Sequence, residues 1–544
     1  FANWYNNGNE VPTDKKIAKE YWDDRLKKVA TFASTDEYLL MNGCDHQPVQ
    51  ADLGKAIEVA SELYPDINFK HSNFPEYIKA IKEKVPNDLA VVKGELTSQD
   101  TDGWSTLMNC ASSHIYLKQM NRKCESALEN GAEPVRVLSS VLGQNYPSDE
   151  LEYSWKKLMQ NHPHDSICCC SVDEVQDEMA TRFNKSKQVA DYLVSEGKRY
   201  IADKINTKEY EKYKNALPFV VFNTAGRERT SVVSVEIDVT RKSGWLKKCA
   251  YDLDEINVPN YKLIDSDGNS IPFKIEDLGV KFGYDLPKDK FRQPYMARRV
   301  RVTFEAENIS AVGYKTYALV EGDTEKVTDT LVSSENCMEN DAIRVEINKN
   351  GSLNVTDKAS GRTYKGVAYY EETGDLGNEY MYKMPEGSKA ITTQDTVAKI
   401  ELAEDEPYRA MYKITNTITV PKSGDDNFED EKSHMVFFKE RVGGRSNDTV
   451  EMKIETFVSL DKNGKGVKIK TRFDNEVKDH RVRIMVPTGI NSDVHKADSV
   501  FEVVTRNNRH NAGWNNPSAC EHEQGFVSID DGEKGIAVAN IGLY

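Results

Sequence analysis

The sequence predicts a multidomain fold in which a partial α/β domain is followed by an all-α helical bundle and then by antiparallel all-β sandwich domains. Three observations support this prediction. Helical and buried-strand patterns alternate at the start, helical periodicity fills the next segment, and β-branched runs with Asn-Gly turns fill the rest. The chain has 544 residues, enough for about three or four domains. We place these domains at residues 1–97, 98–207, 208–330 and 331–544.

The first domain alternates helices with short apolar segments. Three helices are predicted, at 14–32 with Thr13 as N-cap, at 53–63 and after Pro75, and three buried strands, at 38–41, 67–69 and 89–92. Strands separated by helices of this length pair in parallel through right-handed crossovers. Two or three such units are too few for a complete β/α domain, so we expect only part of one.

The second domain is almost entirely helical. Breaks are expected at Gly131, at 143–147 and at 161–170, and the last helix runs from Val172 to about Lys204. A helix of that length needs partners for its apolar face, which predicts a small bundle. We interpret the charged segment 204–217 as a linker.

The region after Pro218 is rich in β-branched and aromatic residues. Two Asn-Gly pairs, Asn350-Gly351 and Asn463-Gly464, lie between alternating runs. An Asn-Gly pair in that setting is the strongest short-range signal of a β-hairpin. The sequence therefore predicts antiparallel sandwiches over both C-terminal domains.

Composition excludes several classes of protein. The 88 acidic residues outnumber the 72 basic ones, giving a net charge of −16 that disfavours nucleic-acid binding. No window reaches the roughly 18 apolar residues of a membrane span. The nine cysteines are odd in number, and Cys168, Cys169 and Cys170 are consecutive, which suits no disulfide framework. We expect reduced thiols and therefore an intracellular, cytoplasmic protein.

The segment Asn161-His162-Pro163-His164-Asp165 is the most informative candidate site. Pro163 disfavours helical backbone at His162, so the preceding helix should end there. Two imidazoles and a carboxylate then lie on a turn, where one can bind a metal while its neighbours bind substrate or orient the ligand. Spacing alone equally allows a structural turn in which His162 caps one helix and Asp165 the next.

The segment from Asn42 to Pro48 is a second candidate, because it follows an expected strand. In β/α enzymes, catalytic groups gather at the carboxyl ends of strands. Asp45 can act as a general acid if apolar neighbours raise its pKa. A turn or N-cap role for Asp45 remains equally open, and His46 beside it can be a ligand, an orienting group or a surface residue.

A third candidate is the segment from Phe1 to Glu10. Its aromatic rings and amide side chains are typical of a sugar-binding loop, although an ordinary Asn-Gly turn has the same composition.

Longer phrases of the chain resemble those of glycoside hydrolase family 38, the retaining α-mannosidases, in a bacterial form. The matching phrases are NHPHDSIC with CCSVDEVQDEM, LLMNGCDHQPVQADL, ENDAIRVEINKNGSLNVTDKASGRTY and DNEVKDHRVRIMVPTG. They follow the family's order along essentially the whole chain. The resemblance implies the end of a seven-stranded β/α catalytic domain, a middle helical bundle and β-sandwiches.

The resemblance also implies roles for single residues. His164 matches the family's bundle-derived zinc ligand, Asp165 a carboxylate that binds mannose hydroxyls, and Asp45 the general acid/base. Two positions depart from the family. Cys169 replaces a usual Gly, so either the turn is disturbed or its backbone does not need positive φ. His114 replaces a usual Arg.

The resemblance further implies that the nucleophilic Asp and the remaining zinc ligands lie upstream of Phe1, so that the chain is a fragment, inactive by itself. Retaining hydrolysis needs two carboxylates, and Asp45 supplies one. The implied function is zinc-dependent hydrolysis of terminal α-mannosides in a mannose-containing oligosaccharide, with a homodimer left open as the assembly. The alternatives are a mannosylglycerate hydrolase and a non-catalytic carbohydrate-binding module.

Overall fold

The computed structural model describes residues 5–91, 93, 95, 104, 106–287, 289–323, 328–510, 512–517 and 519–543. The chain divides into two units, Phe1–Leu96 and Thr97–Tyr544. Within the described ranges, no helix combines the length and the apolar character needed to cross a bilayer.

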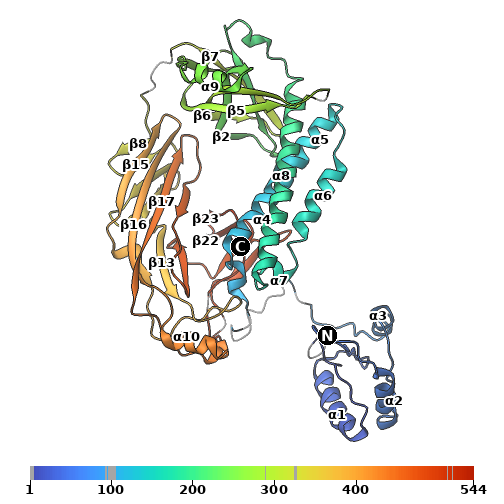
Figure 1. The fold of residues 1–544 in the computed structure, drawn as a ribbon. Coiled ribbons are helices and arrows are strands. Elements are labelled where there is room, and N and C mark those ends of the chain that lie inside the picture. The colour runs from blue at the N-terminus through green and yellow to red at the C-terminus, as the bar shows by residue number, and fades with distance from the viewer. Residues whose placement is uncertain are drawn as a thin grey trace. The chain divides into compact units, whose positions relative to one another are not determined.

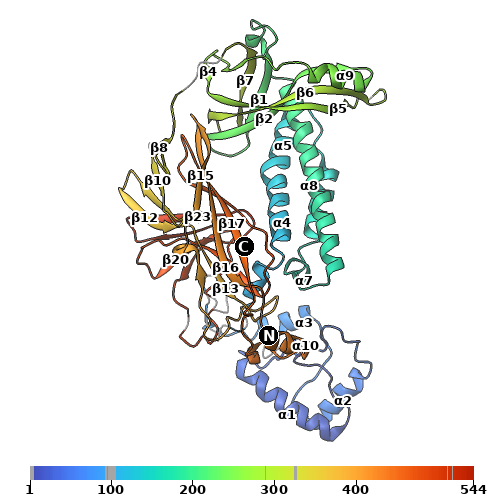
Figure 2. The same cartoon turned by 60° about the vertical axis from the view of Figure 1, so that its left-hand side comes forward.

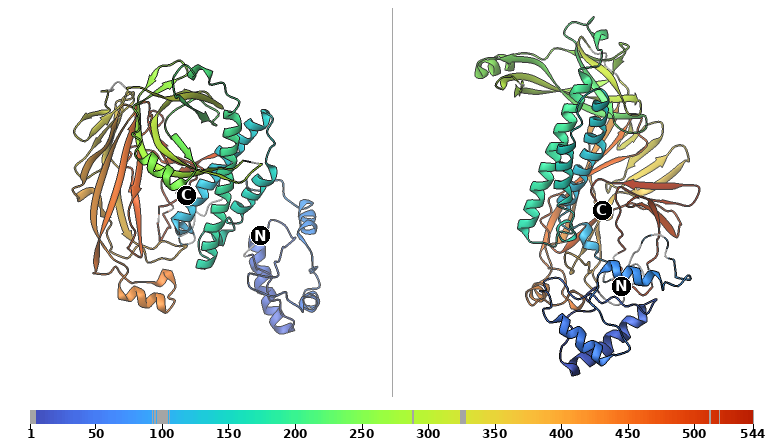
Figure 3. Two further views of the ribbon diagram at one scale, coloured as in Figure 1. Left: turned by 45° about the horizontal axis from the view of Figure 1, so that its top comes forward. Right: turned by 90° about the vertical axis from the view of Figure 1, so that its right-hand side faces the viewer.

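The N-terminal unit is built around a helix pair. Its helices are α1 Lys15–Phe32, α2 Leu53–Leu63 and α3 Phe74–Lys82. Figure 3 shows α1 and α2 (blue) side by side, and the ring of Trp22 on α1 packs 4.7 Å from that of Phe69. The expected cap of α1 is wrong by one residue. Asp14, not Thr13, accepts hydrogen bonds from the N–H groups of Lys16 and Ile17 at 3.0 and 3.1 Å.

The strands predicted in this unit are not found. Residues 38–41, 67–69 and 89–91 run without strand pairing, and Val92 lies outside the described residues. A strand needs a neighbouring backbone for its ladder. Beside residues 39–41 there is one backbone bond, from Gly8 N to Met41 O at 3.0 Å. The other bonds come from the Asn7 side chain, whose nitrogen donates to Leu39 O at 3.0 Å and whose oxygen accepts from Met41 N at 2.7 Å. The expected burial is wrong as well, since Leu89 and Val91 are 45% and 78% exposed and residues 39–41 are only half-buried.

The second unit begins with the expected helical bundle. Its helical elements are η1 Met108–Ala111, α4 Ile115–Ala127, η2 Leu128–Ala132, α5 Glu133–Val141, α6 Ser148–Met159, α7 His164–Ile167, α8 Asp173–Ala202 and η3 Lys208–Tyr210. Figures 1 and 2 show α8 alongside α4 and α5. Its core is formed by apolar side chains of the three longest helices and η2, including Leu117, Leu128, Leu158, Met179 and Phe183.

Two details of the bundle differ from expectation. Gly131 does not break the helix, because η2 is a π turn that joins α4 to α5 without interruption. A Cβ at Gly131 would lie 3.1 Å from Val194, so the glycine permits close packing on α8. The segment 204–217 is not a bare linker, since Tyr210 in η3 is buried against Ile264, Ala318 and Val320.

The β region contains long antiparallel strands, as predicted. Its first part has β1 Leu217–Asn223, β2 Arg229–Ser243, β3 Tyr261–Asp265, β4 Ser270–Ile271, β5 Phe273–Asp285, β6 Gln293–Ile309 and β7 Gly313–Glu321, with α9 Leu246–Asp254. These strands pair as β1-β7-β3-β4 and β2-β6-β5. In Figures 1 and 2, α9 lies against the second of these sheets.

The remaining strands pair as β12-β11-β10-β9-β8, β14-β13-β19, β15-β16-β17-β18 and β21-β20-β22-β23. Their bounds are β8 Val332–Ser334, β9 Cys337–Glu339, β10 Ile343–Ile347, β11 Leu353–Asp357, β12 Arg362–Val367, β13 Tyr369–Gly374, β14 Ile391–Thr392, β15 Lys399–Glu406, β16 Arg409–Pro421, β17 Thr449–Asp461, β18 Lys468–Arg472, β19 His480–Met485, β20 Val494–Asp498, β21 Val503–Asn507, β22 Phe526–Asp530 and β23 Gly535–Ala539. The short helical elements here are η4 Thr393–Asp395, α10 Asp426–Ser433 and η5 Phe438–Glu440.

Both hairpin predictions are confirmed. Strands β10 and β11 pair across Asn350-Gly351, and β17 and β18 pair across Asn463-Gly464. Inward-facing residues from β10, β11, β16 and β17, among them Val345, Leu353, Ile414, Val458 and Leu460, form one buried cluster. The period-2 pattern therefore identified the faces that meet in the core.

Candidate functional site

The His-Pro-His-Asp segment forms a sharp turn between α6 and α7. The N–H groups of Asn161 and His162 close the end of α6 on Leu158 O and Met159 O, both at 3.0 Å. Pro163 is extended, with ψ of 138°, and the four-residue helix α7 begins at His164. The helix therefore ends where Pro163 predicts that it should.

Asn161 fastens this turn to the long helix. Its side chain is fully buried, and its amide nitrogen donates to Met179 O on α8 at 3.0 Å. A buried amide is stable only when it is hydrogen-bonded, so this contact defines the distance between the turn and α8. The bundle thus supplies a rigid support for the residues that follow.

His162 faces α4. Its Nε2 atom lies 2.8 Å from Asn121 Oδ1. Burial lowers the pKa of His162, while the charge of Glu125 opposes that shift. The structural alternative in which His162 and Asp165 act as caps is not seen, because the His162 ring bonds Asn121 and Asp165 lies inside the first turn of α7.

His164 and Asp165 point outward together. Their side chains are 91% and 70% exposed, with His164 Nε2 3.5 Å from Asp165 Oδ1. An exposed imidazole next to a carboxylate can serve as a metal or sugar ligand. The described residues contain no group of three or more His, Cys, Asp or Glu side chains arranged to hold a metal. The exposed ring of His164 therefore suits one zinc ligand and the carboxylate of Asp165 suits contact with a sugar, and both roles stay predictions.

The cysteines after the turn shape its far side. Cys169 has φ of +63°, a left-handed backbone that favours Gly, and it carries a side chain there. Of the two expectations for Cys169, the one that dispensed with positive φ is wrong. The next thiol, Cys170, donates to Asp165 Oδ1 at 3.6 Å. Each of the nine cysteines lies among the described residues as a free thiol.

A loop after β13 supplies neighbours that the sequence did not suggest. The Tyr380 hydroxyl bonds the Cys170 thiol, and this contact, burial and the charge of Asp165 raise the pKa of Tyr380. Asn109 ties the loop to the bundle by donating to Asp375 Oδ2 at 2.8 Å and to Asn378 O at 2.7 Å. Asn109 and Asp375 are 266 positions apart. No local pattern could have joined them.

His114, the second departure from the family, begins α4. It has φ of +44° at the N-cap position, and its ring centroid lies 6.0 Å from that of Tyr116. The structure gives His114 no contact with His164 or Asp165.

Asp45 belongs to the N-terminal unit and lies in a turn closed by Gln47 N donating to Cys44 O at 3.4 Å. The Gln50 side chain closes the wider loop: its oxygen accepts from Val11 N at 3.1 Å and from Asn42 Nδ2 at 2.9 Å. Asp45 is exposed, so the described residues of this unit do not provide the apolar surroundings that we expect around a general acid. His46 is exposed beside it with φ of +62°.

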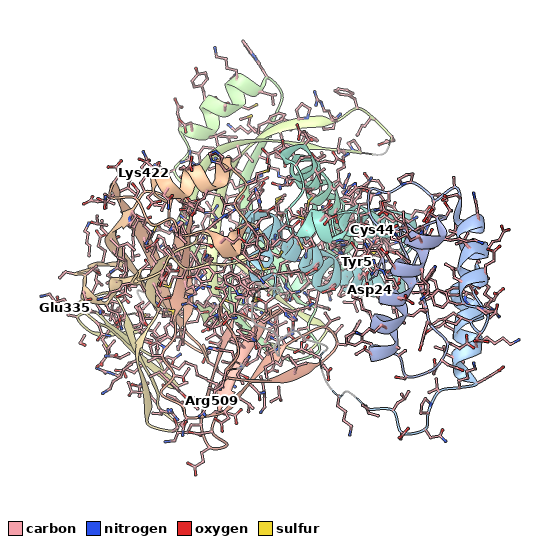
Figure 4. All side chains as sticks on the ribbon, turned by 90° about the horizontal axis from the view of Figure 1, so that it is seen from below. Tyr5, Asp24, Cys44, Glu335, Lys422 and Arg509 are labelled. Atoms are coloured by element: carbon pink, nitrogen blue, oxygen red, sulfur yellow. The ribbon has the colours of Figure 1, made fainter. Side chains whose placement is uncertain are left out.

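The N-terminal segment packs on the Asp45 loop. Cys44 Sγ lies 3.6 Å from the Tyr5 hydroxyl, and Figure 4 labels both side chains. The hydrogen bond with Cys44, together with the charges of Cys44 and Asp45, raises the pKa of Tyr5. Part of the proposed sugar-binding loop, Phe1 to Trp4, lies outside the described residues. The convergence of Asp45 with His164 on one pocket remains a prediction.

Comparison with known families gives three matches that follow the order of the chain. The α-mannosidase middle domain matches residues 105–201. The C-terminal domain 1 of glycosyl hydrolases family 38 matches 214–321, and the C-terminal domain of the same family matches 338–544.

Similar proteins cover the whole chain. A protein of Halalkalibacterium halodurans named "Putative mannosylglycerate hydrolase" is 41% identical over all of this chain and 61% of its own length. An α-mannosidase from Enterococcus faecalis V583 has a TM-score of 0.96 at 42% identity, over 100% of this chain and 62% of that one. A protein in glycosyl hydrolase family 38 from Enterococcus faecalis has a TM-score of 0.87 at 37% identity, over 100% of this chain and 61% of that one. The chain spans less than two thirds of these relatives and belongs to glycoside hydrolase family 38.

Proposed function

We propose that the complete protein is a zinc-dependent retaining α-mannosidase acting on terminal α-mannosides of oligosaccharides. The observation that carries this proposal is the turn that presents His164 and Asp165 side by side, outward and 3.5 Å apart, on the bundle that matches the α-mannosidase middle domain. The likeness of the whole chain to 62% of an α-mannosidase from Enterococcus faecalis V583 supports it further.

The exposed side chains suit distinct roles in this proposal. His164 would hold zinc through a lone pair of a ring nitrogen, and the adjacent Asp165 carboxylate would accept hydrogen bonds from mannose hydroxyls. A bound zinc ion would supply Lewis-acid contacts to the same hydroxyls. The Cys170 thiol holds Asp165 Oδ1 from the side and so limits the rotation of the carboxylate.

Asp45 is the general acid/base in this proposal. Its carboxyl group protonates the departing glycosidic oxygen and later removes a proton from the water that releases the sugar. Retaining glycosidases use a second carboxylate about 5–5.5 Å away as nucleophile. In this proposal Asp45 supplies only one of the two carboxylates, so we expect no turnover of an aryl α-mannoside by this chain alone.

The decisive experiment uses the complete protein and a 4-nitrophenyl α-mannoside. In His164→Ala, zinc content measured by mass spectrometry and kcat/KM should fall together. His71→Ala, which changes another exposed histidine, should leave both unchanged. A His164→Ala protein with normal zinc content and normal kcat/KM would rule out the proposed role.

A mannosylglycerate hydrolase is the second candidate, because the Halalkalibacterium halodurans relative carries that name. Comparing kcat/KM for a glycerate-linked and an α-1,3-linked mannoside on the complete protein separates the two. A non-catalytic carbohydrate-binding module predicts instead that mannoside affinity is unchanged by a chelator and by Asp45→Asn.

A further inference from the structure

A row of side chains links the interior of α4 to the His-Pro-His-Asp turn. Asn121 is almost fully buried on α4. Its amide nitrogen donates to Glu125 Oε1 at 2.8 Å, and its Oδ1 atom lies 2.8 Å from His162 Nε2. One carboxamide therefore bonds both the carboxylate and the imidazole.

These contacts fix the hydrogen-bond roles along the row. An ionised carboxylate only accepts, so the NH₂ group of Asn121 must face Glu125. The oxygen of Asn121 then faces His162 and must accept, which requires a proton on His162 Nε2. The row thus selects one tautomer of the imidazole.

Glu125 is itself held in place. Arg122 Nη1 donates to Glu125 Oε2 at 3.3 Å, and the two side chains are 29% and 22% exposed. A partly buried carboxylate held by a guanidinium has few orientations open to it. The bond to Glu125 therefore fixes the orientation of the Asn121 carboxamide, and the bond at Asn121 Oδ1 in turn fixes the His162 ring.

The held imidazole lies next to the proposed ligands. Only Pro163 separates His162 from His164, and the proline ring restricts its own φ, which is −48°. The other end of the turn is tied by Cys170 N, which donates to Asp165 O at 3.3 Å. With both ends fixed, the directions of His164 and Asp165 depend on the position of His162.

We propose that Asn121 is a positioning residue: by holding His162 Nε2 it sets the orientation of the His164–Asp165 turn toward the sugar. This inference rests on the proposed function. It gives Asn121, on helix α4 of the bundle, a role in positioning without contact to substrate or metal. Displacing a binding group by about 1 Å can cost a hundredfold in rate.

The first test is Asn121→Ala in the complete protein, assayed with a 4-nitrophenyl α-mannoside. We expect kcat/KM to fall about 10- to 100-fold, the usual effect of removing a group that orients a ligand. KM should rise, because Asp165 no longer meets the sugar hydroxyls. A purely structural defect would instead reduce the active fraction and leave KM unchanged. Asn184→Ala, at an exposed position of α8, is the matched control.

A rescue separates positioning from packing. Asn121→Asp keeps the acceptor for His162 but sets a carboxylate against Glu125, so it should be impaired. Adding Glu125→Gln restores an NH₂ group opposite that carboxylate, and the double variant should recover to within about threefold of the unmodified protein. Failure of the double variant to exceed Asn121→Asp would overturn the inference.

A measurement independent of activity reads the tautomer directly. In the complete protein labelled with ¹⁵N-histidine, His162 is assigned from the spectrum of His162→Gln. We expect the Nε2–H form in the unmodified protein and its loss in Asn121→Ala. An Nδ1–H form in the unmodified protein refutes the inference whatever the activity.

The outcomes also distinguish this inference from the proposed function. If the unmodified complete protein hydrolyses no α-mannoside, the function fails and the inference falls with it. If it is active and Asn121→Ala behaves kinetically like Asn184→Ala, only the inference is wrong.

Discussion

The Lys118 ammonium nitrogen lies 3.2 Å from the Cys169 sulfur, and both side chains are almost fully buried. Lys118 also donates to Ser113 O. A buried ammonium group is costly unless it is hydrogen-bonded, so the sulfur provides part of the polar environment that Lys118 needs. The Cys169 side chain therefore contacts a buried charge, at a position where the resemblance leads us to expect Gly. The backbone of Cys169 has φ of +63°.

Cys169→Gly should be more stable than Cys169→Ala by about 0.5–1 kcal/mol. Both variants lose the sulfur, but only Gly relieves a left-handed backbone that costs an ordinary residue about 1–2 kcal/mol. The greater freedom of Gly in the unfolded chain offsets about 0.4–1 kcal/mol of that gain. Urea unfolding of both variants provides the comparison. The usual order, with Ala more stable, would show that Cys169 is not strained.

Lys118→Met should stabilise the Cys169→Ala protein. Without the sulfur, the buried ammonium group loses a partner, which costs about 1–3 kcal/mol, and a methionine of similar length removes the charge. The same substitution in the unmodified protein should be neutral or destabilising, because the sulfur contact is then still intact. The difference between the two backgrounds, measured by urea unfolding, gives the coupling between the side chains. Equal effects in both backgrounds would show that the contact contributes no stability.

Glu523 should make stability fall as the pH rises toward neutrality. Burial raises the pKa of Glu523 to about 7, with the charge of Asp498 adding to the shift and Arg122 and Arg506 opposing it. Its Oε2 atom is buried without a hydrogen-bond partner among the described residues. The unfolded pKa is about 4.3, so the folded state binds more protons between that value and about 7. The stabilisation that protonated Glu523 contributes to the folded state is complete below about pH 4.3 and is lost as the pH rises through about 7.

Glu523→Gln should remove that dependence. The melting temperature of the unmodified protein should decline more steeply between pH 5 and 7.5 than that of the variant. Glu533→Gln, at an exposed position, controls for the loss of one negative charge. Parallel melting curves for the unmodified protein and Glu523→Gln would contradict the assignment.

Asp45→Asn should lower kcat of the complete protein by about 10²- to 10⁴-fold on a disaccharide, because the amide cannot protonate the leaving oxygen. The loss should be smaller with a 4-nitrophenyl leaving group, which departs with little help from a proton. Asp66→Asn changes another exposed carboxylate of the same unit and should have no effect. An equal loss on both substrates would indicate a role other than general acid.

Local patterns predicted much of this fold. The bounds of α2 follow from its apolar periodicity, and both Asn-Gly hairpins form where the alternation indicates. The end of α6 follows from Pro163, whose ring restricts the preceding backbone. In each case the residues that determine the element are neighbours in the sequence.

The features that could not be predicted from the sequence depend on contacts between residues far apart in the chain. An apolar segment such as 38–41 becomes a strand only if a neighbouring backbone pairs along it, and here a single backbone bond from Gly8 and two bonds from the Asn7 side chain take the place of a ladder. The contacts of Asn109 with the loop at Asp375 come from packing between domains. The roles assigned to His164 and Asp45 came from resemblance, since spacing alone also allowed ordinary turns.

The π turn at Leu128–Ala132 has a consequence for engineering this bundle. A π turn holds about one more residue than an α-helical turn, so it absorbs that residue and leaves α5 in nearly the phase of an uninterrupted helix. Removing one residue there should therefore yield a regular α-helix that keeps Val135 and Ser139 in the interior. Removing one residue from regular α-helix just before Val135 should instead rotate α5 by about 100° and move the exposed Val137 and Val141 away from their present positions.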